Sequence, residues 1–292
     1  MKYGTLYAYW TREWNADYCF YVQKVKSLGF DVLEISAGDL LKMSDNQLAE
    51  LDAAAKDLNL AISSNLGPPP DKNISSSSLE IREAGIAFLN NIIRQMSKIH
   101  SYHLVGALYN SWPYDFVDLD KDAIWSRAVE GMKRVAETAC QEGVFLHLEV
   151  LNRFETNLLN VCTEGIQFCK DVDSTNVDLL LDTFHMNIEE DNIPQAFREA
   201  GKQGLLGHVH VGEGNRRLPG QGHLPWAEIG QALRDINYNG MVVMEPFVQC
   251  GGQVGKDIKV WRDLSENASP EEMDRQIAES LKFLHAQFDK TH

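Results

Sequence analysis

The sequence is poor in cysteine, and none of its cysteines are paired at short spacing. Its 292 residues include five cysteines, and no two stand in the CxxC arrangement typical of zinc sites and redox pairs. A large chain with isolated cysteines is typical of a reducing compartment, where cysteine behaves as a small buried hydrophobe. We therefore expect a cytoplasmic protein whose stability comes from an apolar core and not from disulfides.

Basic residues and long apolar runs are also scarce. The chain has 27 lysine and arginine residues against 42 aspartate and glutamate residues, a net charge of −15. Nucleic acids and anionic membranes need a basic surface, so neither is expected as a partner. No stretch reaches the ~18–20 apolar residues that span a bilayer. The first residues also lack the basic and apolar segments of a signal peptide.

The sequence does contain a repeated alternation of short apolar runs and helical patterns. The apolar runs predict eight β-strands, which cover Lys2–Tyr7, Asp31–Ile35, Ala61–Asn65, His103–Ala107, Val144–Glu149, Val177–Asp182, Gly207–Val211 and Met241–Glu245. Segments of helical periodicity separate them and cover Tyr18–Leu28, Asp45–Leu58, Ser78–His100, Ala123–Glu142, Thr163–Val172, Ile193–Ala200 and Trp226–Ile236. A last helix is predicted at Pro270, with Ser269 as its N-cap.

This alternation indicates a parallel sheet, either a closed barrel or an open doubly wound sheet. No GxGxxG motif follows the first strand, so the main marker of an open dinucleotide-binding sheet is absent. We predict an α/β protein with a (β/α)8 TIM barrel, forming one catalytic domain over residues 1–292. Gly67–Pro70 and Gly251–Gly252 follow strand ends and are predicted to be active-site loops; a linker between two domains is the alternative.

Four consecutive predicted strands end in side chains of types that can bind metals. Glu149, Asp182, His210 and Glu245 close strands five to eight, and in a barrel the carboxyl ends of all strands meet at one mouth. Three carboxylates and one imidazole suit Mn²⁺, Co²⁺ or Mg²⁺ better than a thiolate zinc site. Each charge by itself is also explained by a strand that simply ends at the surface.

The two-residue period of a strand distinguishes the histidines near this predicted site. His208 and His210 point to the same side, and His210 lies nearer the mouth, so His210 is the predicted ligand and His208 lies a layer below. By the same period, His147 lies below Glu149 and is predicted to be a core residue or a support for the ligands.

Further polar and aromatic residues follow the same strand ends. Glu155, His185 and Arg216 are placed to bind the hydroxyls of a polyol, although a solvated loop explains Arg216 equally well. Aromatic side chains that could wall a sugar pocket are Tyr7, Trp14, Trp112 and Phe247, with ordinary core packing as the alternative for each.

Several long motifs resemble those of a known family. The chain resembles ketose 3-epimerases of the D-psicose (D-allulose) and D-tagatose type, which belong to the xylose-isomerase-like barrels. The matching motifs are Glu149, the run 181–190, the segments 207–213 and 243–247, and the run 260–265. The resemblance extends over essentially the whole chain. It implies one divalent cation per subunit, Mn²⁺ or Co²⁺ with Mg²⁺ as a further option, and a homo-oligomer, a dimer or a tetramer.

The resemblance also implies a role for each site residue. Glu149, Asp182, His210 and Glu245 would bind the metal, and Glu149 and Glu245 would also be the two acid/base catalysts. Glu155, His185 and Arg216 would bind the O1–O3 end of the sugar. The expected reaction is epimerisation at C3 of free ketohexoses such as D-fructose and D-psicose, through a metal-stabilised cis-enediolate. Inversion needs one base on each face of C3, which two opposed glutamates supply.

Three other functions fit parts of this pattern. A 1,2-aldose–ketose isomerase shares the barrel but moves a proton on one face only. A metal-dependent nuclease for abasic DNA also shares it, but a net charge of −15 disfavours this function. A non-catalytic sugar-binding barrel would need the pocket without two ionised glutamates. A sugar phosphate is the remaining alternative for the substrate, because the glycine-rich loop 212–222 follows strand seven, where barrels often bind phosphate.

Overall fold

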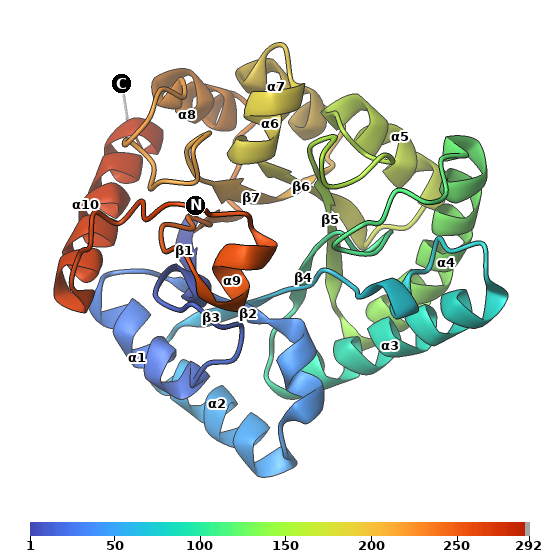
Figure 1. Ribbon diagram of the computed structural model, residues 1–292, viewed down its shortest axis with the longest axis horizontal. Coiled ribbons are helices and arrows are strands. Elements are labelled where there is room, and N and C mark those ends of the chain that lie inside the picture. The colour runs from blue at the N-terminus through green and yellow to red at the C-terminus, as the bar shows by residue number, and fades with distance from the viewer. Residues whose placement is uncertain (290–292) are drawn as a thin grey trace.

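Eight parallel strands close into a barrel in the computed structural model, which describes residues 1–289 (Figure 1). Each strand pairs with its neighbour in sequence, and β1 also pairs with β8. The strands are β1 Lys2–Leu6, β2 Val32–Ser36, β3 Ala61–Asn65, β4 His103–Gly106, β5 Phe145–Val150, β6 Val177–Asp182, β7 Leu206–Val211 and β8 Met241–Met244. Closure confirms the predicted TIM barrel and rules out the open sheet.

Helices form a ring outside the strands (Figure 1). In residues 1–289 they are α1 Tyr18–Ser27, α2 Asp45–Asp57, α3 Leu79–Lys98, α4 Lys121–Glu142, α5 Cys162–Val172, α6 Thr183–Glu189, α7 Ile193–Lys202, α8 Trp226–Asp235, α9 Gly252–Asp257 and α10 Pro270–Phe288. The short helices α6 and α9 were not predicted; α9 begins at Gly252, where a loop was expected. Within residues 1–289, none of the helices combines the length and apolar composition that crossing a bilayer requires.

The helix ends follow the local signals in the sequence. Gly143 ends α4 in the left-handed conformation at φ 71°, which glycine adopts without the steric cost of a Cβ atom. Ser269 caps α10 in a capping box with Glu272, as predicted. These signals place the strand that follows each helix, and therefore the side chains at its carboxyl end.

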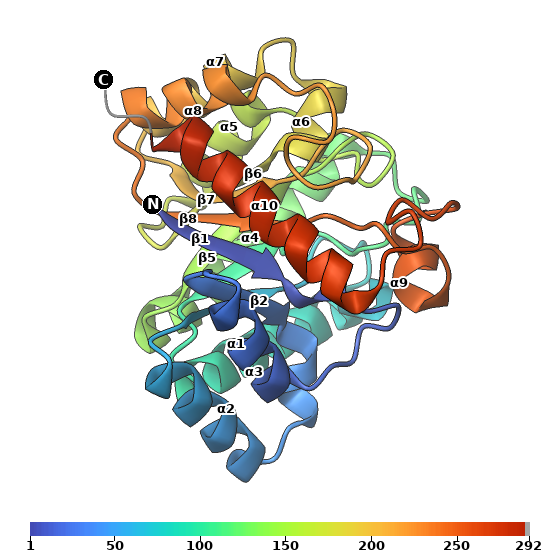
Figure 2. The ribbon, with the colours of Figure 1, turned by 90° about the vertical axis from the view of Figure 1, so that its left-hand side faces the viewer.

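The interior of the barrel holds both apolar and buried polar side chains. Val32, Met241 and Val243 form a small buried cluster that is separate from the large core between strands and helices. Glu34, on the same strand as Val32, and His208, which pairs with Met241, are fully buried. Figure 2 shows α9 at the end of the barrel toward which the strand arrows point, so this short helix lies at the mouth.

Candidate active site

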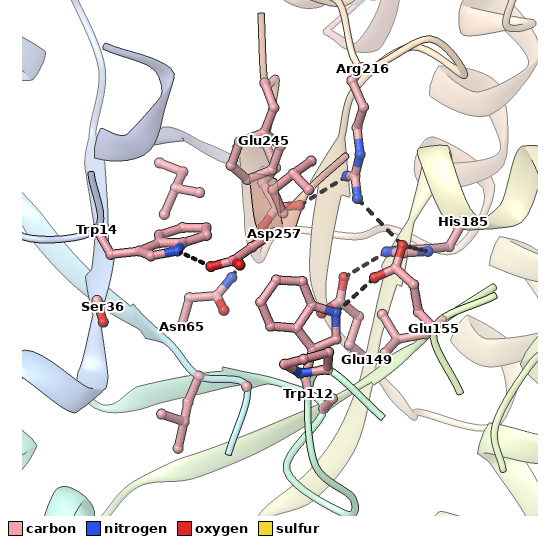
Figure 3. Close-up of a pocket in the computed structure, with 18 of the residues that line it drawn as sticks. Trp14, Ser36, Asn65, Trp112, Glu149, Glu155, His185, Arg216, Glu245 and Asp257 are labelled. Carbon is pink, nitrogen blue, oxygen red and sulfur yellow. Dashed lines mark hydrogen bonds and ion pairs between the residues drawn. The ribbon is translucent and has the colours of Figure 1, made fainter. Parts of the chain in front are cut away.

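A pocket of about 270 Å³ opens at the mouth of the barrel (Figure 3). This volume lies near the lower end of the range for small-molecule sites, about 300–1,000 Å³, and fits a single small ligand. Nine of the eleven predicted site residues line it, namely Tyr7, Trp14, Trp112, Glu149, Glu155, His185, Arg216, Glu245 and Phe247. The other two, Asp182 and His210, are 1% and 0% exposed and lie beneath it.

The predicted metal ligands come together through the register of the strands. Asp182 pairs with His210 across β6 and β7, and Glu149 lies on β5. His210 Nδ1 is 3.6 Å from Glu245 Oε1 and 3.9 Å from Glu149 Oε1. The side chains of Glu149, His210 and Glu245 therefore offer three ligand atoms within 4.8 Å of one another, and Glu149 and Asp182 form a second such group with His185.

The chemistry of this cluster fits a divalent cation. Asp182 Oδ2 and His210 Nδ1 are both buried, and neither has a hydrogen-bond partner within residues 1–289. Carboxylates and a neutral imidazole are ligands suited to Mn²⁺, Co²⁺ and Mg²⁺. Although burial lowers the pKa of His210, the charges of Glu34 and Glu245 outweigh it and raise this pKa to about 10. The surrounding carboxylates therefore favour a positive charge at this point, which a bound cation would supply in place of a proton on His210 Nδ1.

The two glutamates at the centre hold their protons more strongly than ordinary carboxyl groups. Burial raises the pKa of Glu149 well above its usual value, and the neighbouring carboxylate of Glu245 raises it further. Burial also raises the pKa of Glu245 to about 7, although the charges of His210 and Arg216 oppose the shift. Carboxyl groups with raised pKa values are suited to both accepting and donating protons near neutral pH.

His185 is oriented as a hydrogen-bond donor toward the pocket and not as a metal ligand. It lies on α6, and its Nδ1 accepts a hydrogen bond from the backbone N–H of Asn152 at 3.1 Å. Burial lowers the pKa of His185, which favours the neutral ring. The single proton of that ring then resides on Nε2, which is 3.5 Å from both Glu149 and Asp182.

Arg216 and Glu155 form the polar rim above these groups (Figure 3). The Arg216 guanidinium is 3.4 Å from Glu245 Oε2 and 3.8 Å from Glu155 Oε1, and it stacks on Phe184 with its central carbon 3.5 Å from the ring centroid. The backbone of Arg216 is left-handed, at φ 66°, a conformation that costs a non-glycine residue of order 1 kcal/mol. Burial would raise the pKa of Glu155, but His185, Arg216 and two side-chain donors lower it to about 2.

Aromatic rings wall the outer part of the pocket. The Trp14 ring lies edge-on to Trp112 and Phe247, with centroids 6.5 and 6.2 Å apart. Trp112 Nε1 donates to Glu155 Oε2 at 2.8 Å, which joins this wall to the polar rim. A Cβ atom at Gly67 would lie 2.8 Å from Trp112 Cβ, so only glycine allows this close packing.

Sequence reasoning missed three polar residues of this region. Asn65, at the end of β3, donates to Glu245 Oε1 at 3.2 Å, and it lines the pocket. Asp257, on α9, also lines the pocket and accepts a hydrogen bond from Trp14 Nε1 at 2.9 Å. Glu34, in the middle of β2, is 2.9 Å from His210 Nε2. A charged residue inside the apolar run Val32–Ile35 was the signal that could have identified Glu34.

The loop after β7 is organised by one buried carboxylate. Glu213 is 0% exposed, and its Oε1 accepts hydrogen bonds from the Gly220 N–H and from Trp226 Nε1. Its Oε2 accepts from the N–H groups of His223 and Leu224. Three backbone N–H groups of this loop, which a phosphate could otherwise use, are therefore already bonded to Glu213.

A family model for the xylose isomerase-like TIM barrel matches residues 22–286. The D-psicose 3-epimerases of Ruminiclostridium cellulolyticum and Agrobacterium fabrum are 49% and 47% identical over 284 residues; the matches cover 97% of this chain, and 96% and 98% of those proteins. The crystal structure of D-psicose 3-epimerase with D-tagatose from Clostridium cellulolyticum H10 superposes with a TM-score of 0.96 at 48% identity over 99% of both chains.

Proposed function

The chain belongs to the ketose 3-epimerases of the xylose isomerase-like TIM barrel family, which makes it an isomerase, and we propose that it interconverts free ketohexoses of the D-fructose and D-psicose type by epimerisation at C3. One observation carries the proposal. Two buried glutamates with raised pKa values, Glu149 and Glu245, line a pocket of monosaccharide size, and each has a carboxylate oxygen within 4 Å of His210 Nδ1, at 3.9 and 3.6 Å.

The metal site of this proposal consists of Glu149, Asp182, His210 and Glu245. Mn²⁺ or Co²⁺ is the expected ion, with Mg²⁺ as a further option. When bound there, a divalent cation polarises the ketose carbonyl and stabilises the negative charge that develops as the C3 proton leaves. Support comes from Asp182 Oδ2 and His210 Nδ1, which are buried without a hydrogen-bond partner among residues 1–289, and from the excess of carboxylates around them.

Glu149 and Glu245 carry out the two proton transfers of the proposed reaction. One carboxylate removes the C3 proton from one face of the sugar, and the other delivers a proton to the opposite face, which inverts the carbon. Either group can act first, because the reaction runs in both directions. His185 Nε2–H and the Arg216 guanidinium donate to the oxygens near C1–C3, and Glu155 accepts from a hydroxyl there.

The outer part of the pocket binds the far end of the sugar in this proposal. Tyr7, Trp14, Trp112 and Phe247 present apolar faces to C4–C6 and limit the access of water. We also propose that residues 1–292 act as one catalytic domain in the cytoplasm and assemble as a homo-oligomer, a dimer or a tetramer. The match of the family model to residues 22–286 supports the single domain.

A test of the reaction is to incubate the Mn²⁺-loaded protein with D-fructose, D-psicose, D-tagatose and D-sorbose in D₂O. Each product should be the C3 epimer of its substrate and should carry deuterium at C3. An aldose product with deuterium at C1 or C2 would indicate a 1,2-isomerase. Binding without turnover would indicate a sugar-binding barrel. Both outcomes contradict the proposal, and the Glu149→Gln variant is the control for solvent exchange without the enzyme's base.

A further inference from the structure

Glu34 is a fully buried carboxylate that the proposed reaction does not use. It lies on β2, and its Oε1 is 2.9 Å from His210 Nε2 while its Oε2 is 3.2 Å from His208 Nε2. Ser63 Oγ donates to Oε2 at 2.8 Å, and Asn65 Nδ2 donates to Oε1 at 3.2 Å. Four neighbours thus hold the carboxylate in one place, and burying a charge in this way needs such partners.

The two ring nitrogens of His210 face in opposite directions. Nε2 faces Glu34, whereas Nδ1 faces the carboxylates of Glu149 and Glu245. The Nε2 contact has the length of a hydrogen bond, although its angle is not that of a regular one. An ionised carboxylate only accepts protons in hydrogen bonds, so Glu34 favours the form of the ring with the proton on Nε2. The lone pair on Nδ1 is then directed into the proposed metal site.

We propose that Glu34 is the positioning residue of the metal site: it sets the tautomer and the orientation of His210 so that Nδ1 can bind the cation. This inference rests on the proposed function. Carboxylates that hold the second nitrogen of a ligand histidine raise its basicity and fix its ring plane. Asn65 extends the same support to a second ligand, because its amide also donates to Glu245 Oε1 at 3.2 Å.

A second cation between Glu34, His208 and His210 is the rival explanation, since their ligand atoms lie within 4.8 Å of one another. The hydrogen-bond donors disfavour it. The hydroxyl of Ser63 and the amide of Asn65 each direct a hydrogen at one oxygen of Glu34, and those hydrogens would repel an ion at the same place. We therefore expect one ion per chain and not two.

The experiment compares Glu34→Met and Glu34→Gln with the unmodified protein. Methionine keeps the length of the side chain but removes the acceptor, whereas glutamine keeps a weaker, neutral acceptor. Mn²⁺ affinity and stoichiometry are measured by titration calorimetry on the folded, metal-stripped proteins, and kcat and KM are measured at saturating Mn²⁺. Ser63→Ala is the matched control, because it removes a hydrogen bond to Oε2, the carboxylate oxygen paired with His208, and leaves Oε1, which faces His210.

Glu34→Met should bind Mn²⁺ roughly 10- to 100-fold more weakly, and Glu34→Gln should fall between it and the unmodified protein. KM for the ketose at saturating Mn²⁺ should change little, and Ser63→Ala should bind Mn²⁺ nearly as well as the unmodified protein. A purely structural role would lower stability and leave the Mn²⁺ affinity of the folded fraction unchanged, which overturns the inference. Where Glu34→Met does not fold, an unchanged affinity in Glu34→Gln overturns it equally.

Two other outcomes are distinguishable from these. Two ions bound per chain would overturn the positioning role in favour of the second site. No Mn²⁺ binding by the unmodified protein would overturn the proposed metal site itself, and the Glu34 inference with it. Normal Mn²⁺ binding with no loss in Glu34→Met leaves the proposed function standing and removes only the inference.

Discussion

Replacing Glu213 by glutamine should destabilise the loop that carries Arg216. Glu213 lies two residues after β7, and its two oxygens accept four hydrogen bonds, two each. Glutamine can keep one oxygen toward the Gly220 N–H and Trp226 Nε1. Its NH₂ group must then face the N–H groups of His223 and Leu224, so two donors lose their acceptor and meet another donor.

The cost follows from these contacts. A buried donor left without a partner costs about 1–3 kcal/mol, and bonds to a charged acceptor are stronger than neutral ones. The Leu224 N–H is buried, whereas His223 is exposed and its N–H can turn to water, so its share is small. We expect a loss of about 2–4 kcal/mol in the free energy of unfolding. KM for the ketose should also rise, because the same loop holds the Arg216 guanidinium next to Glu245.

The assay is urea unfolding followed by tryptophan fluorescence, together with steady-state kinetics. Glu279→Gln is the control: it removes the same charge from an exposed position on α10 and should change stability by less than about 0.5 kcal/mol. A Glu213→Gln protein as stable as this control, with an unchanged KM, would show that the buried carboxylate does not organise the loop.

Three further predictions concern the chemistry. A chelator should abolish activity and lower the unfolding temperature, because an ion bound only to the folded state stabilises that state. Addition of Mn²⁺ or Co²⁺ should restore both activity and unfolding temperature. Full activity in protein that elemental analysis finds free of metal would contradict the metal site. Glu149→Gln and Glu245→Gln should each lose at least ~10²-fold in turnover, with metal content measured in each, and product formed without deuterium at C3 in D₂O rules out the mechanism. The kcat/KM for D-fructose should exceed that for its 6-phosphate by well over ~10-fold, because Asp257 and aromatic rings line the pocket and Glu213 occupies three N–H groups of the loop after β7. Equal turnover of the two substrates would refute this prediction.

Local patterns in the sequence were enough to predict the barrel and most of its site. Alternating apolar runs marked all eight strands, and Ser269 marked the start of α10. The two-residue period chose His210 over His208, and the structure places His210 Nδ1 beside Glu149 and Glu245. These features depend on residues close together in the chain, whose periodicity directly reports which face is buried.

Only the closed barrel determines which distant side chains touch. Glu34 and Asn65 come from β2 and β3, and nothing near them in sequence indicates that they face His210 and Glu245 across the interior. The donor role of His185 depends on the Asn152 backbone, and the place of Asp257 depends on a six-residue helix at the mouth. The Asn65–Glu245 and Trp14–Asp257 contacts join residues 180 or more positions apart in the chain. They therefore follow from strand closure and loop packing, which no local pattern encodes.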